Sequence, residues 1–244
     1  FGPGRPRQSL SDVAQSAGLA RPTARRLLLT LEELGYVRQR EGAFELTPRV
    51  LTLGTAYVSS LGLWEMARPR MEWLVSRTGE SSSMAQLSGS DIVYVARVSV
   101  PKIIALRVDV GTLFPAPPTS QGKVLLAALS PDELAEALAQ PSRSGVAPRR
   151  QYALDELADE LTQVRARGWA LADEELAAGV RSVAVPVRDA TGATRAAMNV
   201  TVHAAETPLE RLLEEHLPLL QRAAGEVSAD WAMWQSRPHV ETVG

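Results

Sequence analysis

The sequence predicts an α+β protein with two parts: a small amino-terminal helix-turn-helix with a hairpin, and a larger domain of about 160 residues that mixes strands and helices. Three observations predict this organisation. Two short amphipathic segments flank Gly18, a basic pair of strand-like segments follows them, and strand and helix patterns both occur after Gly79.

The composition is that of a folded globular protein. Of the 244 residues, 45% are apolar and 22% are charged, which is enough apolar material for a core. No apolar run reaches the roughly 20 residues of a membrane span, and no signal-like segment opens the chain. The absence of cysteine excludes disulfides, thiol nucleophiles and Cys-ligated zinc. We therefore expect a cytoplasmic protein with no membrane partner, no metal and no cofactor.

The charge is divided unequally along the chain. The net charge is −2, yet the first 50 residues hold eight arginines against five acidic residues. A basic end on an acidic body suggests that the two ends have different partners.

The first two helices are predicted from their ends. Residues 2–7 are too rich in Gly and Pro for regular structure, and Ser9 with Asp12 three residues later is typical of a helix start. Gly18 ends this helix, and a second helix runs from about Arg21 to Leu34. The apolar side chains of the second helix lie within one arc that we expect to pack inward: Ala24, Leu27, Leu28, Leu31 and Leu34.

A hairpin and a linker helix are expected next. Residues 36–40 and 43–46 alternate partially around a turn at Glu41-Gly42. Residues 48–78 are helical, with interruptions near Gly62 and Pro69. The expected organisation is a winged helix-turn-helix over 1–47, a linker helix over 48–62, a second domain over 63–236 and a loose tail over 237–244.

The second domain is predicted to contain strands and helices in mixed order. The expected strands cover 82–87, 91–98, 103–108, 169–172, 182–188 and 195–203. The expected helices cover 120–129, 131–139, 154–167 and 208–234.

The ordered combination of helix, glycine turn, arginine-bearing helix and basic hairpin predicts binding to double-stranded DNA. Arginine can bond guanine in a major groove or neutralise a phosphate, and an extended arm can reach a minor groove. The candidate DNA-binding residues come from the arm, the second helix and the hairpin: Arg5, Arg7, Pro22, Thr23, Arg25, Arg26, Arg38 and Arg40. Solvated surface arginines are the alternative interpretation.

Two features depart from the usual helix-turn-helix. Ala20 stands where a capping Ser or Thr is expected, which Pro22 in the first turn offsets in part. Such a domain usually has a preceding helix that completes its core, so we expect a further helix upstream of residue 1.

The chain resembles the IclR family of bacterial transcription factors. The resemblance is carried by Ser9–Ala14 with Gly18-Leu19 and Ala24–Arg26, by Leu34–Val37 with Leu46–Pro48, by Thr119–Ala127 and by Gly179–Asp189. The arm Gly4–Arg7 and the run Thr47–Leu51 are similar to the subgroup that regulates protocatechuate, 4-hydroxybenzoate and β-ketoadipate catabolism.

This resemblance implies a linker helix, a GAF-like effector-binding domain, and homodimers or tetramers bound to palindromic operators. It also implies a small organic acid from an aromatic pathway as effector. The implied pocket residues are Ile103, Leu106, Phe114, Ser120, Gln121, Ala172, Asp173, Ser182, Asn199 and Thr201. The helix start at Ser120 would offer N–H groups to a carboxylate. Gln121 and Ala172 depart from the family pattern, so the effector's identity and the regulatory sign stay open.

The alternative function is a small-molecule binding or metabolic enzyme domain with an amino-terminal protein-interaction helix pair. The run Ser120–Lys123 resembles a phosphate loop only superficially, because it lacks the first glycine, and Val124 replaces the magnesium-binding hydroxyl. No two histidines among His203, His216 and His239 have metal-ligand spacing. We therefore expect no catalytic residues and no metal ligands.

Overall fold

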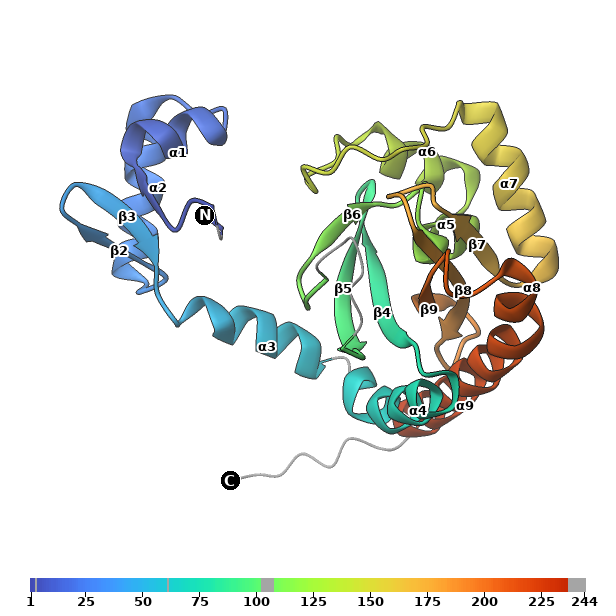
Figure 1. Cartoon of the computed structure of the whole chain (residues 1–244). Helices are drawn as coiled ribbons and strands as arrows, with labels where there is room; N and C mark the ends of the chain where they lie inside the picture. Colours follow the sequence, from blue (N-terminus) through green and yellow to red (C-terminus); the bar gives the residue numbers. More distant parts are fainter. Residues whose placement is uncertain (3, 61, 102–107, 237–244) are drawn as a thin grey trace, which may run out of the picture. The chain divides into compact units, whose positions relative to one another are not determined.

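The computed structural model describes residues 1–2, 4–60, 62–101 and 108–236, with residues 58–60 described by their backbone alone. The chain forms two compact units, residues 1–61 and residues 62–244 (Figure 1). Each unit has its own sheet and is described separately below.

The amino-terminal unit contains α1 (Leu10–Ser16), α2 (Arg21–Glu33) and a three-stranded antiparallel sheet in the order β1-β3-β2. Ser9 and Asp12 form the predicted capping box at the start of α1. The strands are β1 (Arg7–Ser9), β2 (Val37–Arg40) and β3 (Ala43–Leu46). The turn between β2 and β3 places Glu41 and Gly42 at positive φ, as a tight two-residue hairpin requires.

Two expectations for this unit are wrong. Residues 7–9 form strand β1, because their backbone finds partners on the open edge of β3. The apolar arc of α2 is only partly buried: Ala24 and Leu28 lie in the core, whereas Leu27, Leu31 and Leu34 are 49%, 38% and 48% exposed. The small core of Leu28, Val37 and Phe44 covers one side of the helix, and no other described element of this unit covers the rest of the arc.

Two helices follow the hairpin, α3 (Val50–Ser60) and α4 (Leu63–Thr78). The predicted interruption at Gly62 is present, and this residue has a φ of +60°. The predicted interruption at Pro69 is wrong, because α4 continues through it. Pro69 is exposed, so its ring faces solvent and does not clash with the core. The helix loses only the hydrogen bond that the missing N–H of Pro69 would have donated.

The carboxy-terminal unit is built on a six-stranded antiparallel sheet in the order β6-β5-β4-β9-β8-β7. Its strands are β4 (Ser81–Ser88), β5 (Asp91–Val98), β6 (Leu113–Pro115), β7 (Ala170–Asp173), β8 (Val180–Arg188) and β9 (Thr194–His203). Strand β6 has no counterpart among the predicted elements. Of the predicted strand 103–108, only Val108 is among the described residues, and it is not in a strand.

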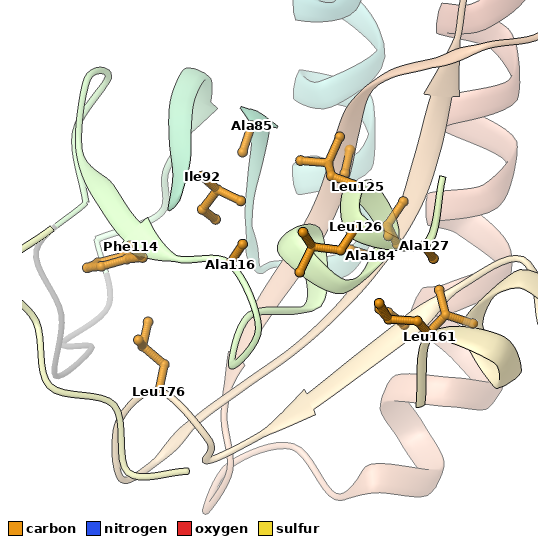
Figure 2. Close-up of a cluster of buried hydrophobic side chains, with 14 of the residues drawn as sticks. Ala85, Ile92, Phe114, Ala116, Leu125, Leu126, Ala127, Leu161, Leu176 and Ala184 are labelled. Atoms are coloured by element: carbon orange, nitrogen blue, oxygen red, sulfur yellow. The ribbon is translucent and has the colours of Figure 1, made fainter. Parts of the chain in front are cut away.

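Helices cover both faces of this sheet. On one face, α5 (Ser120–Ala127) packs on the central strands, and α7 (Leu154–Arg167) packs on α5. The helix α6 (Pro131–Ala139) lies between α5 and α7 in the sequence. Ala85, Leu126, Leu161 and Ala184 belong to the apolar core on this side (Figure 2). Helix α4 and the last helix cover the other face.

The last helical stretch contains a π-helical turn. It consists of α8 (Leu209–Arg211), the turn η1 (Leu212–His216) and α9 (Leu217–Gln235). Pro218 has no N–H with which to continue the regular pattern, and the N–H of Leu217 instead bonds the Leu212 carbonyl. This imino acid explains why the predicted single helix is interrupted.

Candidate functional site

The first half of α2 presents an exposed basic surface. Arg21, Arg25 and Arg26 are all exposed, and none of them forms an ion pair with the residues that the structure describes. Pro22 is exposed beside them, and Thr23 is half-buried. Arg21 belongs to this cluster but was not among the candidate DNA-binding residues. Its position in the first turn of α2 is the sequence signal that could have identified it.

The start of α2 leaves backbone donors open. Ala20 provides no side-chain cap, so the N–H groups of the first turn lack the partner that Ser or Thr would supply. An uncapped amino-terminal turn beside three cations favours an anion, and a DNA phosphate has the required charge.

The arginines of the amino-terminal arm and the hairpin divide into paired and unpaired groups. The Arg38 Nε donates to Glu45 at 2.5 Å, and Arg7 bonds the Arg40 carbonyl at 3.0 Å and Glu41 at 3.3 Å. The hydrogen bond from Arg38 is the main cause that lowers the pKa of Glu45. Arg5 and Arg40 form no ion pair within the described residues. Ion pairs with glutamates therefore compensate part of the positive charge of Arg7 and Arg38.

The carboxy-terminal unit contains a cavity of about 530 Å³, its open mouth included, between α5 and the face of the sheet. Among the residues that the resemblance implied, those lining it are Phe114, Ser120, Gln121, Ala172, Ser182, Asn199 and Thr201. Lining residues that the sequence argument missed include Tyr94, Arg97, Val108 and Leu176.

Three implied pocket residues are not among the described residues that line this cavity. Ile103 and Leu106 lie outside the described residues. Asp173 is not among the lining residues, because both of its carboxylate oxygens bind the Arg181 guanidinium, at 2.7 and 3.1 Å. This ion pair explains the position of Asp173 at the end of β7 without a ligand.

One polar network crosses the floor of the cavity. The Arg97 Nη1 donates to the Ser83 hydroxyl at 2.9 Å, and the Ser83 N–H donates to the Asn199 Oδ1 at 3.0 Å. The Asn199 amide then donates to the Thr201 hydroxyl at 3.0 Å. A second pair, the hydroxyls of Ser120 and Ser182, lies 2.8 Å apart.

Gln121 joins two strands and leaves one acceptor open. Its Nε2 donates to the carbonyls of Ser83 at 3.0 Å and Ala197 at 2.9 Å. These two bonds fix the orientation of the amide, since a flip would turn its oxygen towards two carbonyl groups. The buried Oε1 has no hydrogen-bond partner among the described residues, so it can accept a hydrogen bond from a ligand hydroxyl.

The walls of the cavity are apolar and aromatic. The rings of Tyr94 and Phe114 meet edge to face with their centroids 5.7 Å apart. Burial raises the pKa of the Tyr94 phenol, which therefore stays neutral at physiological pH. Apolar and aromatic walls favour an apolar ligand body, and the polar floor can orient its substituents.

Lys123 does not serve the cavity as a phosphate-loop lysine would. Its buried Nζ donates to the Glu175 carboxylate at 2.7 Å and to the Leu171 carbonyl at 2.8 Å.

The described residues include no group of three or more His, Cys, Asp or Glu side chains placed to hold a metal. Within the described ranges, no helix is both long enough and apolar enough to cross a membrane.

Comparison with known proteins matches both units. The family described as IclR helix-turn-helix domain matches residues 1–41, and the family described as bacterial transcriptional regulator IclR C-terminal matches residues 55–229. The Pca regulon regulatory protein of Pseudomonas putida is 36% identical over 220 residues, which are 90% of this chain and 76% of the relative.

Two solved structures are similar over almost the whole chain. A putative transcriptional regulator from Rhodococcus sp. RHA1 is 46% identical with a TM-score of 0.77, covering 96% of this chain and 94% of its own. An IclR homologue from Microbacterium hydrocarbonoxydans, complexed with 4-hydroxybenzoate, is 26% identical with a TM-score of 0.76, covering 96% and 95%. The Pseudomonas putida and Rhodococcus proteins are named as regulators, which favours a regulator over the enzyme alternative.

Proposed function

The chain belongs to the IclR family of bacterial transcriptional regulators, and from this premise we propose that it binds a palindromic DNA operator and responds to a small organic acid. The resemblance drawn from the sequence, including the aromatic-catabolism subgroup, is confirmed. The helix-turn-helix and effector-domain architecture is confirmed as well.

The observation that carries the DNA-binding proposal is the exposed, unpaired cluster of Arg25 and Arg26 on α2. Helix α2 enters a major groove with Pro22 and Thr23 near its leading end. Arg38 and Arg40 lie over the sugar-phosphate backbone, and Arg5 with Arg7 lies closest to a neighbouring groove or phosphate. The ion pairs of Arg7 and Arg38 make these two the weaker contacts.

A palindromic operator requires two copies of the chain. Two α2 helices reach successive major grooves about 34 Å apart on one face of the duplex. Leu51 and Leu53 of α3 are 70% and 56% exposed, and such apolar side chains on a linker helix favour packing against a second copy. The protein is thus proposed to act as a cytoplasmic homodimer or tetramer, without a cofactor.

The effector is proposed to be a single-ring organic acid. The walls of the cavity are aromatic and aliphatic, and its floor offers several donors. A similar structure holds 4-hydroxybenzoate, which makes this compound the first ligand to test.

DNA binding by this protein should weaken steeply as salt is raised. Replacing Arg25 or Arg26 with alanine is expected to reduce affinity for a duplex that the protein selects from a random pool by roughly 5- to 100-fold, because each arginine loses a base or phosphate contact. A lost phosphate contact also lowers the slope of log affinity against log salt by about 1. Fluorescence anisotropy at four salt concentrations measures both quantities.

Arg77→Ala is the matched control, because Arg77 is an exposed arginine on α4 in the other unit. It should leave affinity and salt slope unchanged. If Arg25→Ala and Arg26→Ala bound DNA as the Arg77→Ala control does, α2 would not be the DNA-reading helix.

A further inference from the structure

Arg97 is a cation that lines the cavity and has no ion pair with a described acidic residue. We infer that Arg97 binds the carboxylate of the effector and so selects an acid over a neutral analogue. This inference rests on the proposed function, since it names the residue through which the same cavity recognises its ligand.

A β-bulge places Arg97 in the cavity. The register between β4 and β5 passes from Met84 opposite Ala96 to Ala85 opposite Tyr94, so Val95 is an extra residue. In a regular strand, positions 94 and 97 would face opposite sides of the sheet. The extra residue brings both onto the cavity side, where both are lining residues.

Among the described residues, the guanidinium forms one side-chain hydrogen bond, and its other donors have no partner there. The Ser83 hydroxyl accepts from Nη1 at 2.9 Å, and Ser83 is itself fixed through its N–H to Asn199. Arginine has five N–H donors in a rigid fork that matches the two oxygens of a carboxylate. A ligand carboxylate at this point can therefore receive two parallel hydrogen bonds and full charge compensation.

Burial makes this unpaired charge costly in the free protein. Desolvation is the largest influence on Arg97, and it lowers the pKa of the guanidinium, while the nearby Asp109 acts in the opposite sense. A partly desolvated cation gains more from an anion than an exposed one does, because water screens it less.

Arg97 is better suited to this role than the start of α5. Among the described lining residues it carries the only formal charge. At the helix start, the Ser120 hydroxyl already pairs with Ser182, and the N–H of Gly122 is capped by Thr119. The neutral donors of α5 and the open Oε1 of Gln121 then serve the other substituents of the ring.

The test compares 4-hydroxybenzoate with 4-hydroxybenzamide, which keeps the ring and the hydroxyl but has no charge. Isothermal titration calorimetry of the full chain should give a dissociation constant about 10- to 100-fold lower for the acid, because a charged hydrogen-bonded pair is lost with the amide. Arg97→Gln should remove this preference, and Arg97→Lys should retain part of it, since lysine keeps the charge but lacks the fork.

The melting temperature without ligand separates recognition from a structural role. Arg97→Gln should leave it nearly unchanged, because the variant removes a partly buried charge that forms no ion pair within the described residues. A variant that binds the acid with an undiminished preference would overturn the assignment of Arg97 while leaving acid sensing by the cavity in place. If the unmodified protein bound neither 4-hydroxybenzoate nor its amide, the proposed effector class and the role of Arg97 would both be wrong.

Discussion

Replacing Gly122 with alanine is expected to destabilise the carboxy-terminal unit by roughly 3 kcal/mol, at the upper end of the usual cost of overpacking. A Cβ at this position would overlap the carbonyl group of Ala116, where the backbone of the proline-rich loop crosses α5. Backbone atoms cannot rotate away as a side chain can, so the loop or the helix must shift. Urea denaturation followed by circular dichroism measures the loss.

Gly225→Ala provides the matched control. Gly225 lies within α9, has an ordinary helical φ, and an added Cβ would meet no atom within 4 Å. Alanine there should leave stability unchanged or raise it by up to about 1 kcal/mol, because alanine favours helix. If Gly122→Ala had the same unfolding midpoint as the unmodified protein, the close approach of the loop to α5 would be refuted.

Lys123→Met is expected to cost about 3–5 kcal/mol, because it leaves the buried Glu175 carboxylate without its main counter-charge. The Tyr152 hydroxyl, which donates to Glu175 at 2.6 Å, supplies a hydrogen bond but no charge. Chemical denaturation is again the measurement. Arg68→Met, which breaks an exposed ion pair with Glu72 on α4, should cost less than about 1 kcal/mol.

The double variant Lys123→Met with Glu175→Leu distinguishes charge from packing. Removing both charges should recover a large part of the stability, since apolar pairs often replace buried ion pairs at little cost. Equal losses in the single and double variants would mean that the volume of Lys123 matters more than its ion pair.

The parts of this fold that the sequence predicts correctly are those with local signals. The capping box at Ser9 and Asp12, the Glu41-Gly42 turn and the break at Gly62 all follow from residues whose backbone or side chain decides a turn by itself. The continuation of α4 through Pro69 is a counter-example, because the outcome depends on which side of the helix faces solvent.

The cavity was only partly predictable. Phe114, Ser120 and Asn199 were placed by family resemblance, and each lines the cavity. Tyr94 and Arg97 were missed because their common side depends on a bulge, which is a property of the pairing between β4 and β5. The sequence signal for Arg97 as a cavity residue was its position directly after the apolar run Ile92–Ala96.

The apolar arc of α2 shows a similar limit of prediction from sequence. Periodicity identifies Leu27, Leu31 and Leu34 as one face, yet it cannot supply the element that would cover them. Side-chain periodicity predicts which residues share a face, and burial then depends on what the rest of the fold brings to it.

The central claim is that DNA binding and acid binding are linked in one molecule. The direct measurement is the dissociation constant for the selected duplex, taken at one salt concentration with the cavity empty and with it saturated by 4-hydroxybenzoate. We expect the two values to differ by about 5- to 150-fold, with the DNA changing the affinity for the acid by the same factor. Equal DNA affinities with the cavity empty and full would contradict the account.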